Sequence, residues 1–182
     1  RTYPLTPFFN AYYDKPRVYA FNLDGSFVEG EGWPFYDSDN YIPFLSDVGD
    51  IDGDGVPEAV ILSYKKLYLV NYNGQIIWKY DIPEVQNPIT PLVLKTFVPA
   101  VKIVDLDKNG VSEILISFTR MVELISNDGQ KIWRIDFPEI AENSLTQSNI
   151  VDLDGDGKEE MFYWGIEVSG NQAIEHLYTI NH

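Results

Sequence analysis

The feature of this chain that most constrains its fold is a short acidic loop that occurs three times. The copies read DIDGDGVPE from Asp50, DLDKNGVSE from Asp105 and DLDGDGKEE from Asp152, so their first residues lie 55 and 47 residues apart. Each copy leads into an apolar run of β-branched and large residues. A repeat of this length predicts one supersecondary unit per period, as in propeller blades or stacked arrays.

A second motif recurs with the same period and supports the repeat independently. It reads VYAFNLDG from Val18, LYLVNYNG from Leu67 and VELISNDG from Val122, and each copy ends in Asn-Gly or Asp-Gly. These dipeptides favour tight hairpin turns because they readily adopt positive φ. The acidic loop, the apolar run, this motif and a following run that carries a Trp predict four short strands per unit. No segment has the 3.6-residue apolar period of a helix.

The predicted fold class is therefore all-β, with β-propeller blades built as four-stranded antiparallel meanders and about three to four blades in this chain. Residues 1–182 are expected to form part of a single propeller domain. Its predicted parts are strands 3 and 4 of a blade (1–35), two full blades (36–82 and 83–137) and strands 1 to 3 of a further blade (138–182).

Three explanations fit a repeat that ends in the middle of a unit. The blades can be consecutive parts of a longer protein, two chains can close a ring together, or the segment can be a stable open array. We favour the first, because an open array would leave sheet surfaces unpaired, which natural folds avoid.

Each acidic loop carries the oxygen ligands that a hard cation requires. Oxygen-bearing side chains occupy positions 1, 3 and 5, a Gly occupies position 6, position 7 offers its backbone carbonyl, and an acid follows at position 9. Close carboxylates repel one another without a cation, so calcium is the expected cofactor, with up to three ions. The predicted ligands are Asp50, Asp52, Asp54, Val56 and Glu58; Asp105, Asp107, Asn109, Val111 and Glu113; Asp152, Asp154, Asp156, Lys158 and Glu160.

The loops do not have the pattern of an EF-hand, which requires a bidentate Glu at position 12 followed by a helix. Position 12 is Ile61, Ile116 or Tyr163, and a strand-like run follows the acid at position 9. With that acid, the loops resemble the calcium loops of the integrin α-subunit propeller and of FG-GAP or VCBS-type repeats. The resemblance covers essentially the whole chain and implies a calcium-binding propeller. Whether the Glu at position 9 binds the metal directly is left open.

The middle loop differs from the other two at positions 4 and 5. Lys108 and Asn109 replace a Gly and an Asp, so the charge of its ligands is −3, against −4 in each of the other loops. Because cation affinity in such loops depends on the number of charged ligands, the middle loop is predicted to bind calcium more weakly.

Composition excludes several classes of partner and site. The net charge of −15 and the pI near 4.3 argue against nucleic acid, which requires a basic surface. No apolar run approaches the roughly 20 residues that span a bilayer, so no membrane span is expected in this segment. The chain has no Cys, which excludes disulfides and Cys-based zinc sites. Calcium-loaded acidic modules suit an extracellular or cell-surface location, where millimolar calcium fills weak sites.

The predicted meander places the acidic loops and the Gly turns on one face of the propeller. The strand 2–3 loops and the connections between blades then lie on the opposite face, including a long connection over residues 165–176. Because rigid scaffolds usually bind through such loops, we expect a protein or carbohydrate ligand there. Candidate contacts are Tyr36, Tyr41, Lys95, Arg120 and His176, although the sequence offers His176 no acidic partner at a telling spacing. Trp78 and Trp133 are expected to pack between blades.

Two function classes follow from these observations. The favoured one is a non-catalytic, calcium-stabilised propeller module of a secreted or cell-surface protein that serves adhesion, assembly or ligand binding. Its other partners would be the remaining blades, from the same or another chain. The alternative, implied by resemblance, is a propeller-type polysaccharide lyase that acts on rhamnogalacturonan with the help of calcium. The sequence shows no Ser-His-Asp arrangement and no paired carboxylates outside the loops, which favours the first class.

Overall fold

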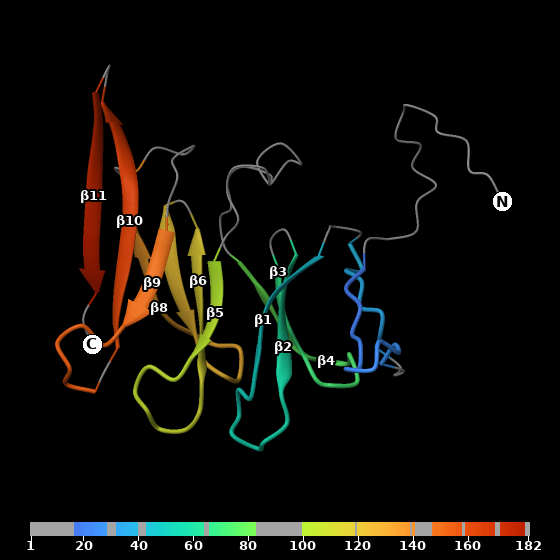
Figure 1. Ribbon diagram of the computed structural model, residues 1–182. Helices are drawn as coiled ribbons and strands as arrows, with labels where there is room; N and C mark the ends of the chain where they lie inside the picture. The colour runs from blue at the N-terminus through green and yellow to red at the C-terminus, as the bar shows by residue number, and fades with distance from the viewer. Residues whose placement is uncertain are drawn as a thin grey trace, which may run out of the picture.

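In the computed structural model, antiparallel strands joined by turns and loops make up the residues that are described. These residues are 17–28, 32–39, 43–63, 66–82, 100–118, 120–138, 140, 147–157, 159–169 and 172–180. The all-β prediction is confirmed in them, because every regular element there is a strand (Figure 1). No helix within these ranges is long and apolar enough to cross a membrane.

The strands form three separate sheets, each a meander in which chain neighbours pair antiparallel. The first sheet contains β1 (Pro43–Gly49), β2 (Glu58–Ser63), β3 (Lys66–Val70) and β4 (Ile76–Asp81). The second contains β5 (Ala100–Val104), β6 (Glu113–Phe118), β7 (Met121–Ile125) and β8 (Lys131–Asp136). The third contains β9 (Gln147–Val151), β10 (Glu160–Ser169) and β11 (Gln172–Ile180). Residues before the first sheet add two isolated antiparallel bridges, Val18 with Phe35 and Phe21 with Phe27.

The third sheet corrects one expectation about loop length. Gly165 to His176 was expected to be a long connection, but β10 and β11 extend through most of it and pair continuously from Met161–Ile180 to Ser169–Gln172. β-branched residues such as Ile166 and Ile174 favour strand on both sides of a Gly-Asn dipeptide, which is itself a hairpin signal. The connection is therefore a strand hairpin that projects from the sheet (Figure 1).

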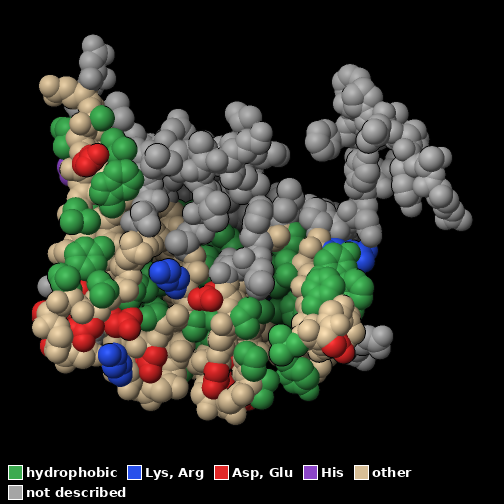
Figure 2. Space-filling model, in the orientation of Figure 1, with side chains coloured by type: hydrophobic (Ala, Val, Ile, Leu, Met, Phe, Trp, Pro, Cys, Tyr) green, Lys and Arg blue, Asp and Glu red, His purple; other side chains and the backbone are tan. Residues whose placement is uncertain are grey.

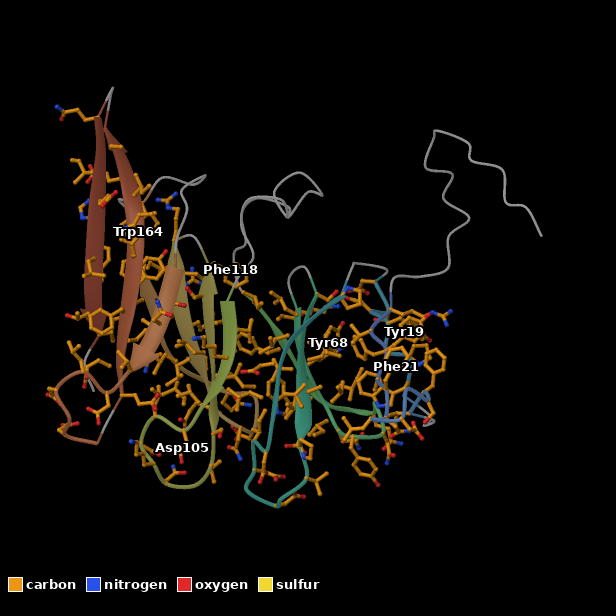
Figure 3. The ribbon with its side chains drawn as sticks, in the orientation of Figure 1. Tyr19, Phe21, Tyr68, Asp105, Phe118 and Trp164 are labelled. Atoms are coloured by element: carbon orange, nitrogen blue, oxygen red, sulfur yellow. The ribbon has the colours of Figure 1, made fainter. Side chains whose placement is uncertain are left out.

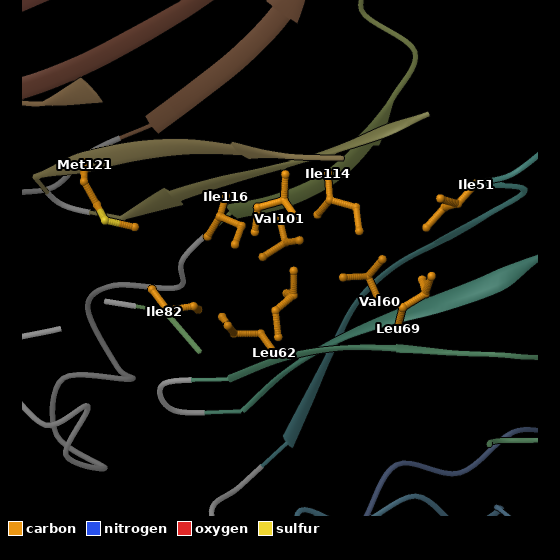
Figure 4. Close-up of a cluster of buried hydrophobic side chains, with 11 residues drawn as sticks. Ile51, Val60, Leu62, Leu69, Ile82, Val101, Ile114, Ile116 and Met121 are labelled. Atoms are coloured by element: carbon orange, nitrogen blue, oxygen red, sulfur yellow. The ribbon is translucent and has the colours of Figure 1, made fainter. Parts of the chain in front are cut away.

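Apolar side chains fill the spaces between successive sheets. One cluster joins Val60, Leu62 and Leu69 of the first sheet to Ile114 and Ile116 of the second (Figure 4). A second cluster joins the second sheet to the third, and a third joins Val18 and Trp33 to the first sheet. Strand β2 is buried along its whole length because it is covered on both faces, which explains why its sequence is continuously apolar rather than alternating.

Tryptophan side chains connect neighbouring units by hydrogen bonds as well as by packing. Trp33 Nε1 donates to the carbonyl of Tyr72, and Trp78 Nε1 donates to the carbonyl of Asn127, each at 2.8 Å. Both acceptors lie in the hairpin turn that precedes the last strand of the next sheet. Trp78 and Trp133 also pack against the two inter-sheet clusters, as expected for residues between units.

The turn that receives Trp78 requires a glycine for two reasons. Gly129 has φ of 83°, and a Cβ added there would lie 2.9 Å from Cδ2 of Trp78. Gly25 occupies the same place in the first copy of the motif and also has φ of 83°, but an added Cβ would meet nothing within 4 Å. Gly25 is therefore needed only for its positive φ, whereas Gly129 is needed both for its positive φ and for the space that Trp78 occupies.

We predict that Gly129→Ala lowers the free energy of unfolding by at least about 1 kcal/mol more than Gly25→Ala. Both changes force Ala into positive φ at a cost of about 1–2 kcal/mol, but only the first displaces Trp78 and its hydrogen bond, which contributes about 1 kcal/mol. Urea unfolding followed by tryptophan fluorescence measures both values. Equal losses would show that Trp78 docking contributes nothing to stability.

Candidate functional site

The acidic loops connect the first two strands of each sheet and lie along one side of the molecule. They join β1 to β2, β5 to β6 and β9 to β10 (Figure 1), and Asp105 marks the middle loop in Figure 3. Acidic side chains gather along the same side in the space-filling view (Figure 2). The three copies of the acidic motif thus form three similar loops, which lie at the same end of the three sheets.

The first Asp of each loop organises the backbone that follows it. Asp50 Oδ1 accepts hydrogen bonds from the amides of Gly53 and Asp54 at 2.8 and 3.1 Å, and Oδ2 accepts one from Gly55 at 2.9 Å. Asp105 accepts from Asn109 and Gly110, and Asp152 accepts from Gly155 and Gly157. These bonds bend each loop around one carboxylate.

The side chains at positions 3 and 5 continue this pattern with local bonds of the Asx type. Asp52 Oδ1 accepts from the amide of Asp54 at 3.1 Å, and Asp54 Oδ1 accepts from the amide of Val56 at 2.7 Å. Asp107 and Asn109 make the equivalent bonds in the middle loop. Asp154 accepts from the amide of Asp156 in the third.

The Glu at position 9 connects the end of each loop to its beginning. It is the first residue of the second strand, and its Oε2 accepts a hydrogen bond from the amide of position 2. The three bonds are Glu58 with Ile51 (3.1 Å), Glu113 with Leu106 (3.0 Å) and Glu160 with Leu153 (2.8 Å). Glu58 and Glu160 are buried despite their charge, so each carboxylate is held in place at the base of its loop.

Positions 1, 3 and 9 bring three carboxylates together in every loop. In each group one oxygen from every residue lies within 4.8 Å of the others, and the three groups can each hold a metal ion. We call them the carboxylate triads: Asp50, Asp52 and Glu58; Asp105, Asp107 and Glu113; Asp152, Asp154 and Glu160. Such a donor set of hard oxygens suits a hard metal cation.

The remaining predicted ligands lie outside the triads. Asp54, Asn109 and Asp156 at position 5 are loop residues that are not part of these groups. Val56 and Val111 at position 7 donate their amides to the position 5 side chains of the first two loops. The prediction for Lys158 falls outside the described residues. Among the carboxylates of the described residues, those of positions 1, 3 and 9 form the groups that can hold a metal ion, and the other predicted ligands stay a prediction.

The negative charges within a triad repel one another and make ionisation of the buried Glu less favourable. Burial raises the pKa of the Glu58 carboxyl, and the nearby negative charges of Asp52, Asp54 and Asp50 raise it further. Burial and then Asp107 and Asp105 raise the pKa of Glu113 in the same way. A bound cation would compensate both effects, because it offers an opposite charge in contact with the buried carboxylate.

The middle loop has a backbone feature that its neighbours lack. Lys108 has φ of 58°, whereas Gly53 and Gly155 occupy the equivalent position in the other loops with φ of 80° and 77°. Gly53 and Gly155 donate their amides to the first Asp of their loops. No matching bond joins the Lys108 amide to Asp105 among the described residues. The middle loop is thus both strained and less tightly connected.

Neighbouring loops also contact each other directly. The amide of Ser112 in the middle loop donates to the carbonyl of Ile51 in the first loop at 2.9 Å. A Cβ added to Gly53 would lie 2.9 Å from the carbonyl oxygen of Gly110. The first two triads therefore belong to one connected set of loops.

A cavity of about 390 Å³ opens beside the middle triad, between the second and third sheets. Apolar side chains such as Leu124, Trp133 and Met161 line it, together with the carboxylates of Asp107, Glu113 and Glu159. No pattern within one repeat indicates this cavity, because its walls come from two different repeats.

Two of the candidate contacts away from the acidic loops, Arg120 and His176, bind other parts of the protein. Arg120 Nη2 donates to the carbonyl of Pro138 at 2.6 Å. His176 Nε2 lies 2.8 Å from Glu167 Oε2 across the β10–β11 hairpin, so His176 has an acidic partner that its spacing in the sequence does not indicate. Tyr36 is exposed. Tyr41 and Lys95 lie outside the described residues.

Known proteins resemble this chain in structure but not detectably in sequence. No family model matches the chain, and no curated protein matches it. Among solved structures, BBS1N, determined in complex with ARL6DN, aligns over 90% of this chain with a TM-score of 0.51 and 14% identity. A protein of unknown function from Bacteroides caccae gives a TM-score of 0.47 at 12% identity over 92% of this chain, and the Photorhabdus luminescens Tc holotoxin pore gives 0.45 at 18% over 90%.

Of these matches, the one with BBS1N bears on the fold, and on the fold alone. The chain spans about half the length of the first two proteins, 47% and 54%, and 8% of the third. The alignment with BBS1N includes most of the chain, so it supports one common arrangement of the three sheets rather than a local match to a single sheet.

We predict that metal-free Glu58→Gln is at least as stable as the unaltered protein at pH 7. The folded pKa of Glu58 is raised above its unfolded value, so the folded state binds this proton more tightly, and stability falls as pH rises through the folded pKa. Gln keeps an oxygen for the Ile51 amide and removes the charge. The advantage should disappear below the ordinary glutamate pKa of about 4.3.

Urea unfolding between pH 4 and 8 in the presence of a chelator measures this effect. Glu175→Gln is the matched control, since Glu175 is exposed on β11 and its replacement should change little. A large loss of stability in Glu58→Gln at pH 7 would contradict the electrostatic account of the triad.

Proposed function

We propose that this chain is a calcium-stabilised β-propeller segment that serves as a non-catalytic scaffold for adhesion, assembly or ligand binding outside the cell or at its surface. The observation that carries the proposal is the threefold recurrence of the carboxylate triad at one place in the sheet. One acidic cluster would be unremarkable on the surface of an acidic protein. Three clusters built by equivalent backbone bonds indicate a common ligand.

Calcium is the cation that the triads fit best. All three side chains of each triad offer carboxylate oxygens, and none of the three triads contains a His. Calcium prefers oxygen donors, whereas zinc prefers nitrogen and sulfur. If bound, calcium would be held by the carboxylates of positions 1, 3 and 9. It would neutralise their negative charges and would take no part in a reaction. In this proposal Glu58, Glu113 and Glu160 are direct ligands.

The propeller assignment is supported by the way the sheets follow one another. Two successive four-stranded meanders pack face to face, and the Trp of one sheet docks on the turn of the next. A propeller repeats this arrangement around an axis. The structural similarity to BBS1N is compatible with a single repeated architecture. Integrin α-like or FG-GAP and VCBS-type membership remains part of the proposal, on the strength of the loop pattern.

The bonds of the triad carboxylates are the support for a non-catalytic role in this proposal. The triad carboxylates accept backbone amide bonds that shape their own loops, so they hold the fold together. The lyase alternative depends on resemblance alone, and we do not propose it. An extracellular setting suits the role, because modules with weak calcium sites require millimolar calcium.

We predict that calcium raises the Tm of the protein and that removal of one carboxylate per triad abolishes the effect. Each site saturated at 100 times its Kd adds about 2.7 kcal/mol, or roughly 5–10 °C for a chain of this size. The test variant is Asp52→Asn with Asp107→Asn and Asp154→Asn, since Asn keeps an oxygen for the loop amide and removes the charge.

Scanning calorimetry with calcium and with a chelator measures the shift. Asp24→Asn is the control, because Asp24 accepts local bonds from Ser26 in a turn but is not a member of a triad, so its calcium response should be unchanged. No calcium shift in the unaltered protein would remove the metal from the proposed function.

We also predict that the middle loop is the weakest of the three calcium sites. Its ligand charge is lower, and Lys108 takes positive φ where the other loops have Gly, so the loop attracts a cation less and is harder to hold in its folded form. Isothermal titration should resolve two tighter sites and one weaker site. Lys108→Gly combined with Asn109→Asp should bring the weak site to the level of the others, whereas three equal sites in the unaltered protein would contradict the prediction.

A further inference from the structure

The middle acidic loop contains a chemically labile pair of residues that the other two loops lack. Position 5 is Asn109 and position 6 is Gly110, whereas Asp54 and Asp156 occupy position 5 in the other loops. A glycine has no side chain to shield its amide nitrogen, so this nitrogen can attack the side-chain amide carbon of a preceding asparagine. The sequence contains one other Asn-Gly pair, Asn73-Gly74, in the turn before β4.

The Asn73-Gly74 pair is held by contacts with a neighbouring unit. Gly74 is buried, and a Cβ added to it would lie 2.5 Å from the carbonyl carbon of Gly32. The carbonyl of Asn73 accepts a hydrogen bond from the amide of Gly32 at 3.1 Å, and the Gly74 amide donates to the carbonyl of Asn71 at 2.8 Å. Attack on the asparagine requires the peptide group between the two residues to rotate, and this packing opposes such a rotation.

The Asn109-Gly110 pair is held only by bonds within its own loop. Both residues are exposed, and a Cβ added to Gly110 would meet nothing within 4 Å. Asn109 Oδ1 accepts from the amide of Val111 at 2.7 Å, and the Gly110 amide donates to Asp105 Oδ2 at 2.9 Å. Local opening of this one loop therefore releases both reacting groups, without unfolding of the sheets.

The same loop is also the one whose backbone is held least well at position 4. Lys108 takes φ of 58° there, a conformation that is costly for a residue with a side chain. In the other loops Gly53 and Gly155 occupy this position, and each donates its amide to the first Asp at 2.8 Å. Within the part of the chain that the structure describes, the Lys108 amide makes no such bond. The middle loop should therefore open more readily than the others.

We propose that Asn109 is a site of spontaneous deamidation in the folded protein. A bond forms between the Gly110 amide nitrogen and Asn109 Cγ, the bond from Cγ to Nδ2 breaks, and the side-chain nitrogen leaves as ammonia with the proton of the Gly110 amide. Water then opens the cyclic imide at one of its two carbonyls. The products are aspartate at position 109 or an isoaspartyl linkage to Gly110, and water is the only co-reactant.

The reaction would change the calcium site that the middle loop is proposed to form. Aspartate at position 5 is the residue that the other two loops already have, and it restores the ligand charge that the middle loop lacks. This product should bind calcium more tightly than the original loop. The isoaspartyl product adds one carbon to the backbone of the loop and should bind more weakly. This consequence rests on the proposed function, whereas the chemical step does not.

Peptide mapping by mass spectrometry measures the step directly. The folded protein is kept with a chelator at neutral pH, well below its Tm, and the peptides that carry Asn109 and Asn73 are followed over time in the same sample. We expect Asn109 to lose its amide several times faster than Asn73. Equal rates, a faster loss at Asn73, or an Asn109 that keeps its amide throughout would overturn the proposal.

Two substitutions at Lys108 test the role of the loop backbone. Lys108→Gly relieves the positive φ and allows the amide bond to Asp105, so loss of the Asn109 amide should slow about fivefold, which corresponds to about 1 kcal/mol. Lys108→Ala is the matched control, because it removes the same charge but keeps a side chain at positive φ, and its rate should equal that of the unaltered protein. Asn73 should be unaffected in both. Equal rates in the two variants would contradict the assigned cause.

The variant Asn109→Asp carries the product with the normal backbone and tests the consequence for calcium. Isothermal titration should show tighter binding at the middle site than in the unaltered protein, and unchanged binding would overturn the expected effect on that site. Loss of the amide is measured with a chelator, so its outcome does not depend on calcium. An unaltered protein that binds no calcium but deamidates at Asn109 would refute the proposed function and support the modification.

Discussion

Three carboxylates held close together at the start of the second strand are the constraint on which each sheet of this protein depends. The first Asp bends the loop by accepting backbone amides, and the Glu at position 9 ties the loop to the strand. This brings negative charges together in a partly buried place, and burial raises the pKa of Glu58 and Glu113. The loop geometry is therefore favourable for hydrogen bonding and unfavourable for charge, and a bound cation would resolve the conflict.

The sheets in turn depend on one another. A meander of three or four short strands cannot bury both of its faces alone, and here the second sheet completes the first through a shared apolar cluster and the docking of Trp78 on the 127–129 turn. Direct contact between the first two acidic loops adds to this coupling. Stability is thus expected to arise from interfaces between repeats as much as from each repeat itself.

The sequence predicted those parts of the structure that depend on local pattern. The strand runs, the acidic loops and the packing role of Trp78 and Trp133 all follow from residues that recur at a fixed place in the unit. The Gly turns likewise follow from dipeptides that adopt positive φ. Repetition made these predictions strong, because three copies constrain the interpretation of each one.

The parts that the sequence did not predict depend on contacts between distant residues. Glu167 partners His176 only because the β10–β11 hairpin continues beyond its expected end. Glu123 lies fully buried in an apolar strand and accepts a hydrogen bond from Tyr80 in the preceding sheet at 2.5 Å. Glu123 occupies the place in the motif that Tyr68 has in the first sheet. The repeat pattern therefore did not indicate that an acidic side chain at this position would be buried between sheets. The sequence predicted five ligands in each loop, and it did not indicate that the carboxylates of positions 1, 3 and 9 would be the ones to lie together.

The most direct test of the central claim, that the triads hold calcium, is X-ray diffraction from crystals grown with calcium, with anomalous data collected at long wavelength. The account predicts three anomalous peaks, each between the carboxylates of one triad, with the peak at Asp105, Asp107 and Glu113 the weakest. Ordered loops without any anomalous peak at these positions would contradict it.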